Sequence, residues 1–179
     1  MTQSKLIFLV GLMCVGILSR WIPHPMNFTA VGAIALLIGS TYRMRWVSLV
    51  LPMLILFLSD LVLGLHSTMI YVYSAFLISI LMGQLIPKQN YFQKSQAVKI
   101  LGLSLSSSLI FFVITNFGVW ISGGLYLKTF QGLVTCFVMA IPFLKNQVLG
   151  DLFFSGILFS AYELLSRRVE IGSKITTSV

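Results

Sequence analysis

The chain has 179 residues, 58% of them apolar and only 9% charged, and this composition excludes an ordinary soluble domain. Its 12 Lys and Arg residues outnumber its 4 Asp and Glu residues. They stand in short clusters at the ends of apolar segments, which indicates membrane topology signals and argues against nucleic-acid binding. The length leaves no room for a separate nucleotide-binding domain, so we expect a single transmembrane domain over 1–179.

Six apolar segments are predicted to cross a membrane, whose hydrocarbon core of about 30 Å needs about 20 helical residues. They are residues 6–22, 28–41, 46–65, 69–86, 97–120 and 146–166. The second has only 14 residues, which gives a helix of about 21 Å. We therefore expect the Pro-His-Pro loop before it to dip inward and to border a pocket.

Residues 131–141 are apolar but too short to cross, and Pro142 is expected to end them. We interpret them as a re-entrant or interfacial helix in the outer loop before the last segment. The predicted fold is therefore all-α and integral to the membrane, a bundle of six transmembrane helices with this additional helix.

The basic residues are divided unevenly when alternate segment ends are assigned to one side of the membrane. Nine lie on one side and three, Arg20, Lys128 and Lys145, on the other. This bias predicts that both termini face the cytoplasm.

Several small or weakly polar side chains lie inside the apolar segments. Ala35 with Gly39, and Gly156 with Ser160, have the helical spacing that favours close helix contacts. Three serines on the fifth segment are expected to hydrogen-bond across helices: Ser104, Ser107 and Ser108. Cys14 and Cys136 lie in apolar stretches without Cys or His partners, so we expect buried, inert thiols and no metal site.

Polar residues that are unusual in a membrane protein fall near the predicted outer ends of the segments. Asp60 and Asp151 would lie about 9 Å below their outer loops, a depth at which a carboxylate costs roughly 2.5–3.5 kcal/mol without water or a partner. We predict one outward-facing cavity in which the aspartates supply charge, asparagines supply hydrogen bonds, histidines contact the ligand or a metal within it, and aromatic rings stack. The candidate substrate-binding residues are His24, Asn27, Thr29, Asp60, His66, Tyr71, Asn116, Trp120, Asn146 and Asp151.

Two other interpretations use the same residues. Asp60 or Asp151 could pair with Arg20 or cap a helix, which would make the protein a structural or assembly factor. Alternatively, the two aspartates could relay ions in a secondary carrier. No Gly-x-Ser-x-Gly, His-Glu-x-x-His or phosphate-binding glycine loop is present, and nothing flanking the aspartates favours a two-aspartate hydrolase, so we expect neither an enzyme nor a cofactor.

Four sequence blocks resemble a family of small, functionally uncharacterised bacterial membrane proteins. They are Arg20-Trp-Ile-Pro-His-Pro-Met-Asn-Phe-Thr-Ala-Val-Gly-Ala33, Ser59-Asp60 with Gly64, Thr115-Asn-Phe-Gly-Val-Trp120, and Ala140-Ile-Pro-Phe143 with Asn146 and Gly150-Asp151. This family more distantly resembles the substrate-binding S components of energy-coupling factor (ECF) transporters. That resemblance implies six helices, a pocket built by outer loops, and a vitamin or other micronutrient as the cargo. It also implies docking through small residues, here Ala35 and Gly39, onto a membrane scaffold with ATPases.

Overall fold

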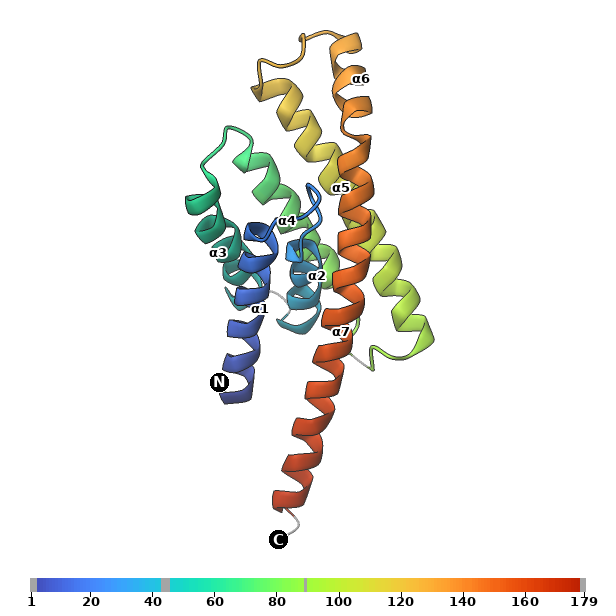
Figure 1. Cartoon of the computed structure of the whole chain (residues 1–179). Helices are drawn as coiled ribbons and strands as arrows, with labels where there is room; N and C mark the ends of the chain where they lie inside the picture. Colours follow the sequence, from blue (N-terminus) through green and yellow to red (C-terminus); the bar gives the residue numbers. More distant parts are fainter. Residues whose placement is uncertain (1–2, 43–45, 89, 178–179) are drawn as a thin grey trace.

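The computed structural model describes residues 3–42, 46–88 and 90–177, and every regular element in this part of the chain is a helix. The helices are α1 (Gln3–Trp21), α2 (Val31–Tyr42), α3 (Trp46–Leu63), α4 (Met69–Gly83), α5 (Lys94–Ser122), α6 (Phe130–Met139) and α7 (Ile141–Thr177). The chain reverses direction between consecutive helices up to α6, whereas α6 and α7 run one after the other in the same direction (Figure 1). Both termini lie at the same end of the molecule (Figure 1).

Three helices are long and apolar enough to cross a membrane: Trp46–Leu63, Lys94–Ser122 and the Ile141–Arg168 part of α7. The apolar parts of the remaining four helices are shorter, and that of α1 is Leu6–Trp21. Length and hydropathy therefore identify three candidate spans where the sequence pattern predicted six.

The short helix expected before the last span is present as α6, but its predicted end is wrong. Thr129 caps its first turn by accepting a hydrogen bond from the Gly132 N–H at 3.1 Å. The helix ends at Met139, and Pro142 lies in the first turn of α7. Proline is tolerated there because the first N–H groups of a helix have no intrahelical partner. As a result α7 begins before the expected position 146 and continues beyond 166.

The centre of the bundle is α2, in which every residue from Val31 to Thr41 is buried. It contacts α1, α3, α4, α5 and α7. Its approach to α4 requires glycine on both sides, because a Cβ on Gly39 would collide with the Ile80 carbonyl and one on Gly83 with the Leu36 carbonyl.

The small residues therefore do not have all the roles that the sequence suggested. Ala35 and Gly39 are buried inside the chain, so their predicted use for docking onto a scaffold is wrong. The expected close contact at Gly156 is also wrong, because a Cβ there would meet no atom within 4 Å.

The predicted interhelical contacts of the α5 serines are confirmed. These side chains need partners because a buried hydroxyl without a hydrogen bond is unfavourable. The contacts are Ser107 with Ser79 of α4 at 2.7 Å, Ser104 with Ser155 of α7 at 3.4 Å, and Ser108 with Asp151 of α7 at 2.7 Å.

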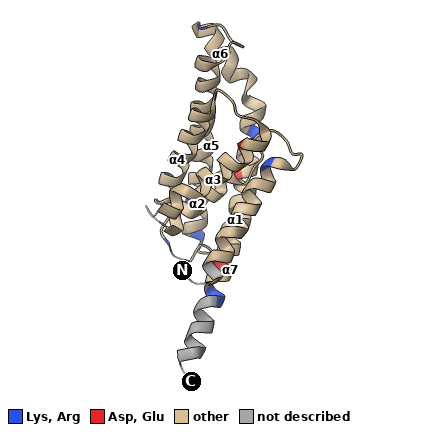
Figure 2. Cartoon of the chain, turned by 90° about the vertical axis from the view of Figure 1, so that its left-hand side faces the viewer, with Lys and Arg blue, Asp and Glu red and all other residues tan. Residues whose placement is uncertain are grey.

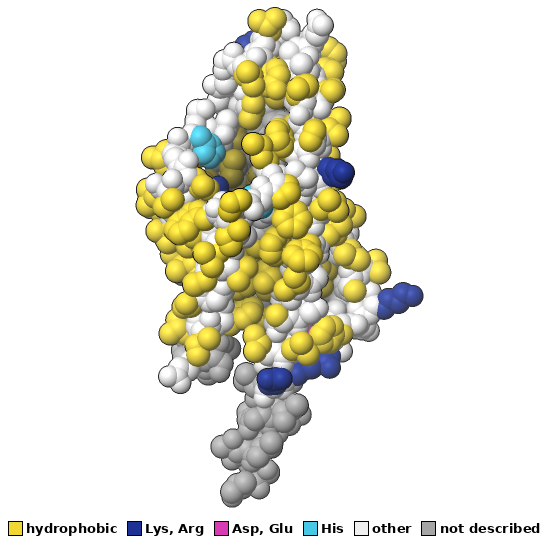
Figure 3. All heavy atoms as spheres, in the orientation of Figure 1, with side chains coloured by type: hydrophobic (Ala, Val, Ile, Leu, Met, Phe, Trp, Pro, Cys, Tyr) yellow, Lys and Arg dark blue, Asp and Glu magenta, His cyan; other side chains and the backbone are white. Residues whose placement is uncertain are grey.

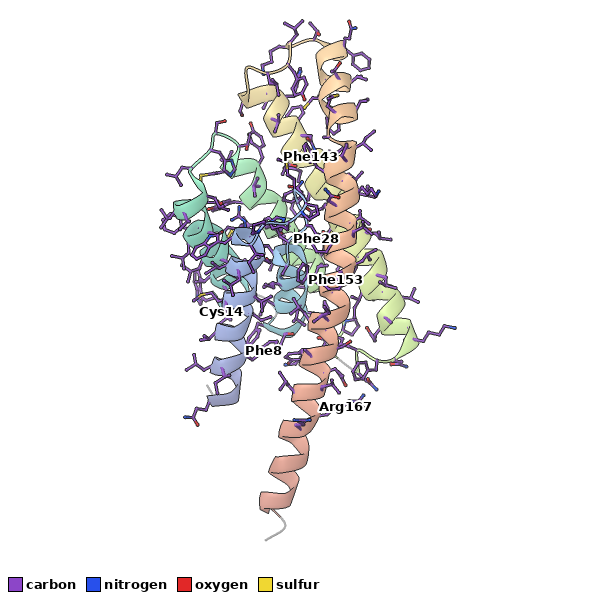
Figure 4. The ribbon with its side chains drawn as sticks, viewed as in Figure 1. Phe8, Cys14, Phe28, Phe143, Phe153 and Arg167 are labelled. Carbon is purple, nitrogen blue, oxygen red and sulfur yellow. The ribbon has the colours of Figure 1, made fainter. Side chains whose placement is uncertain are left out.

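Large apolar side chains cover much of the face of the bundle that Figure 3 shows. On α5 they recur every four residues at Leu105, Leu109, Val113 and Phe117, each more than 40% exposed. Cys14, which the sequence predicted to be buried, is exposed on α1 (Figure 4). The sequence gives no account of which face of α1 meets the bundle, because that helix is apolar all round.

The described basic side chains at the end that holds the termini are exposed: Lys88, Lys94, Lys99, Arg167 and Arg168. In Figure 2 the blue ribbon segments that mark Lys and Arg lie at this end and, as a second set, further along the molecule. Arg43 and Arg45 lie outside the described residues, as do the side chains of Lys5 and Lys174.

Candidate functional site

The first of two neighbouring cavities has a volume of about 390 Å³ and lies between the α1–α2 loop, the α3–α4 turn and helices α4, α5 and α7. Figure 3 shows a hollow on this face with histidine and basic side chains beside it. The polar lining residues are Arg20, His24, Asn27, Thr29, His66 and Gln147. The apolar lining residues are Met26, Leu63, Val72, Phe76, Phe111 and Phe143.

Arg20, at the end of α1, is held in the cavity wall by α3. Its Nη2 forms an ion pair with Asp60 Oδ1 at 2.7 Å, and its Nη1 donates to the Leu56 carbonyl at 3.2 Å and to the Ser59 hydroxyl. The second Asp60 oxygen accepts from the Tyr73 hydroxyl at 2.8 Å. Asp60 is therefore buried behind Arg20, with side chains that are 1% and 15% exposed, and does not line the cavity. This is the Arg20 pairing that the structural interpretation of Asp60 allowed.

Asp151 stands behind Gln147 in a similar way. Its Oδ2 accepts from Gln147 Nε2 at 2.8 Å and from the Ser108 hydroxyl at 2.7 Å. Its Oδ1 has no hydrogen-bond partner among the described residues and lies against Gly32, where a Cβ would collide with it. The carboxylate therefore sits at the N-terminal end of α2, whose partial positive charge stabilises an anion.

The α1–α2 loop brings several polar groups to the cavity in one turn. Asn27 has a φ of 67°, a left-handed conformation that asparagine tolerates better than most residues. The Phe28 N–H donates to the Pro25 carbonyl at 2.9 Å, and Gly150 of α7 lets the Phe28–Thr29 backbone approach closely. Phe28 also packs against Phe153 of α7, with ring centroids 5.9 Å apart (Figure 4).

Each histidine uses one ring nitrogen within its own loop. His24 Nδ1 lies 2.7 Å from the Pro25 carbonyl, which can only accept, so this nitrogen carries the proton. His66 Nδ1 hydrogen-bonds with the Thr68 hydroxyl at 2.8 Å. Nε2 remains for a ligand in both residues, and in neutral His24 it is an acceptor.

The second cavity, of about 280 Å³, lies between α5 and α6 and adjoins the first. Asn27, Val72, Phe111 and Phe143 line both. Its further polar wall consists of Thr68, Thr115, Asn116, Tyr126 and Cys136. Cys136 is buried and its thiol donates to the Asn116 carbonyl at 3.4 Å.

The structure thus divides the ten predicted site residues into three groups. Five line a cavity: His24, Asn27, Thr29, His66 and Asn116. Asp60 and Asp151 lie one layer behind, in contact with Arg20 and Gln147. Tyr71, Trp120 and Asn146 line neither cavity.

The two aromatic residues outside the cavities have other partners. The Tyr71 ring packs against Gly118, and its hydroxyl accepts from Ser122 at 3.3 Å. Trp120 Nε1 donates to the Leu127 carbonyl at 2.9 Å, and Lys128 stacks over the indole ring. The expected stacking walls are instead phenylalanines, which sequence reasoning passed over because phenylalanine is frequent throughout the chain.

Two polar residues that line the first cavity, Arg20 and Gln147, were not among the ten candidate substrate-binding residues. Gln147 begins a polar stripe repeated every four residues on α7, with Asp151 and Ser155, and all three are buried. Within the described residues, no group of three or more His, Cys, Asp or Glu side chains is arranged to hold a metal ion.

All four sequence blocks that carry the family resemblance contribute to this region, through Arg20, Asp60, Thr115 and Phe143 among others. No curated protein matches the chain in a sequence search. A family model described as a family of unknown function, DUF6580, matches residues 1–174. The chain therefore belongs to the DUF6580 family.

Proposed function

We propose that this protein is a multi-pass protein of the bacterial inner membrane that binds a small solute in an outward-facing cavity and takes part in its uptake. α1 to α5 make five of the six crossings, and α6 together with α7 makes the last. Short helices such as α2 need not reach both surfaces by themselves, because the other helices surround them.

The surface of the bundle supports a membrane location. Exposed leucine, valine and phenylalanine side chains on α5 and α7 would be unfavourable in water and are favourable against lipid. Five of the seven described exposed basic residues lie at the end with both termini, which favours a cytoplasmic location for this end and an outer location for the cavities.

The observation that carries the binding function is the composition of the first cavity. Its wall combines a partly buried guanidinium, two histidines and amide or hydroxyl groups with three phenylalanines. A small-molecule site typically has this mixture of apolar walls with a few oriented polar groups, in a volume of roughly 300–1,000 Å³. The polar groups come from separate segments of the chain and still meet at one cavity. Polar residues that only hold helices together would not need to share a cavity, so this arrangement favours ligand binding.

The resemblance to ECF transporter S components extends the proposal to the energy source. The chain contains no phosphate-binding glycine loop, so ATP-driven uptake would require a separate scaffold with ATPases. Because Ala35 and Gly39 are buried, such a scaffold would contact a different surface.

The test is whether a solute occupies the first cavity. The protein is purified from its own membranes in nanodiscs, and native mass spectrometry measures any bound small molecule. Val72 lines both cavities, so Val72→Trp places a bulky ring in the space that a solute would occupy. The matched control Ile70→Trp makes the same kind of enlargement on the same helix, at a residue that is 72% exposed. A solute present in wild type and in the control but lost from Val72→Trp supports the proposal. Val72→Phe replaces the tryptophan variant if that variant does not fold.

A second candidate function is structural, and one observation favours it. Both membrane aspartates are engaged by side chains of neighbouring helices and neither lines a cavity. If wild type carries no solute, and a panel of metabolites does not raise its melting temperature, the structural function replaces uptake.

A further inference from the structure

We infer that the two cavities form one elongated site for an amphipathic anion, with its carboxylate or similar head group at Arg20 and its apolar body between α5 and α6. This inference rests on the proposed binding function and specifies the chemical class of its solute.

The two cavities are adjacent because they share part of their walls. Four side chains, Asn27, Val72, Phe111 and Phe143, belong to both, so at most this one layer of side chains separates the two cavities. The second cavity contributes mainly apolar surface from α5 and α6, including Val119, Met139 and Ala140. The second cavity also differs from the first in having no charged side chain among its described lining residues. A solute that fills both cavities would therefore be uncharged and partly apolar at the end that enters the second.

The sign of the charge follows from which ionised groups face the cavities. Among the described lining residues, Arg20 alone has a formal charge at neutral pH. Asp60 and Asp151 are 1% exposed and are covered by the residues that contact them. A cationic head group would find no carboxylate to pair with, whereas an anion could use the edge of the guanidinium that faces the cavity.

Asp60 acts as a positioning residue for Arg20 in this site. The ion pair, the Ser59 contact and the bond to the Leu56 carbonyl fix the guanidinium before a ligand arrives. A fixed guanidinium loses little side-chain entropy on binding, which favours recognition of a planar anionic group.

The remaining polar groups specify the part of the solute near α7. Gln147 donates its Nε2 to Asp151, so its carbonyl oxygen is the acceptor left for a ligand. His24 also presents an acceptor when neutral, since its Nδ1 proton is used by Pro25. An N–H or O–H group on the solute, in addition to its anionic head, would satisfy these acceptors.

Cys136 allows the proposal to be tested without knowing the natural solute, because its thiol lines the second cavity. In a Cys14→Ser background it is the single remaining cysteine of the chain. The rate of its alkylation by N-ethylmaleimide is measured by intact mass in nanodiscs. Three matched probes compete for the site: 3-phenylpropanoate, 3-phenylpropanol and 3-phenylpropylammonium.

The anion is expected to slow alkylation of Cys136 with a half-protecting concentration about tenfold below that of the alcohol, the gain expected from one charge-assisted hydrogen bond. The ammonium probe should protect least. In the double variant Arg20→Gln/Asp60→Asn, which removes both charges together, the carboxylate should lose its advantage. Lys145→Gln, which removes an exposed cation of α7 that lines neither cavity, should leave it unchanged.

Equal protection by all three probes, or an advantage of the carboxylate that persists in the double variant, overturns the inference. So does a Cys136 that does not react, because the second cavity would then not be open to a solute. If a co-purified solute is nevertheless lost in Val72→Trp, only the anionic elongated site fails and the proposed binding function stands.

Discussion

Removal of Arg20 should destabilise the protein more than removal of the charge on its partner Asp60. The reason is the difference in burial, since the Arg20 side chain is 15% exposed and that of Asp60 is 1% exposed. Arg20→Gln leaves a buried carboxylate with the Tyr73 hydroxyl as its remaining strong donor. The loss of one partner from a buried ion pair costs about 3–5 kcal/mol.

Asp60→Asn leaves the guanidinium with the Ser59 hydroxyl, the Leu56 carbonyl and contact with the cavity. We expect a smaller cost, about 1–3 kcal/mol, typical of a polar group that has lost part of its hydrogen bonding. The double variant removes both charges and should be no less stable than Arg20→Gln. The sum of the two single losses in the free energy of unfolding should therefore exceed the loss in the double variant by about 1–3 kcal/mol.

The measurement is the free energy of unfolding, from reversible titration with sodium dodecyl sulfate in mixed micelles, followed by circular dichroism. Lys145→Gln serves as the control for loss of a positive charge at an exposed position. Strictly additive single effects, or an Asp60→Asn variant that is less stable than Arg20→Gln, would refute the argument from burial.

Two glycine substitutions test the packing around α2 with the same titration. Gly32→Ala drives a Cβ into the Asp151 carboxylate and should cost about 1–3 kcal/mol, as for other overpacked positions; Gly11→Ala, where a Cβ meets no atom within 4 Å, should be neutral or slightly stabilising. Gly39→Ala should cost a similar amount to Gly32→Ala, because its Cβ would collide with the rigid Ile80 carbonyl. The same stability for all three variants would contradict the close approaches described here.

The local features of the fold that could be predicted from the sequence are those with a strict physical requirement. A hydroxyl inside an apolar helix needs a partner, so the interhelical contacts of Ser104, Ser107 and Ser108 followed from their position alone. Pro142 does not determine the local structure in this way, because a proline is found both just after the end of a helix and in its first turn. The sequence favoured the end of a helix, whereas the structure has the start of α7.

The sequence indicated which segments contribute to the candidate site but not which of their side chains reach the cavity. Gln147, Asp151 and Ser155 recur every four residues, a spacing that places them on one face of a helix, and all three are buried on α7. Which of these residues reaches the cavity depends on what lies across from each one. Ser108 and Gly32 surround Asp151, and only Gln147 is left beside open space. Such relations join residues from different helices and have no periodic signal within one segment.

The burial of every residue from Val31 to Thr41 in the 12-residue helix α2 has a consequence for how the protein is made. A helix of this length rises about 18 Å, less than the thickness of the hydrocarbon core, and is too short to remain across a bilayer alone. During synthesis it depends on α1 and on helices that follow it, including α3, α4 and α7, to cover it. Insertion of the first four helices is therefore expected to be cooperative, and a nascent chain stopped before α4 should not retain α2 in its final place.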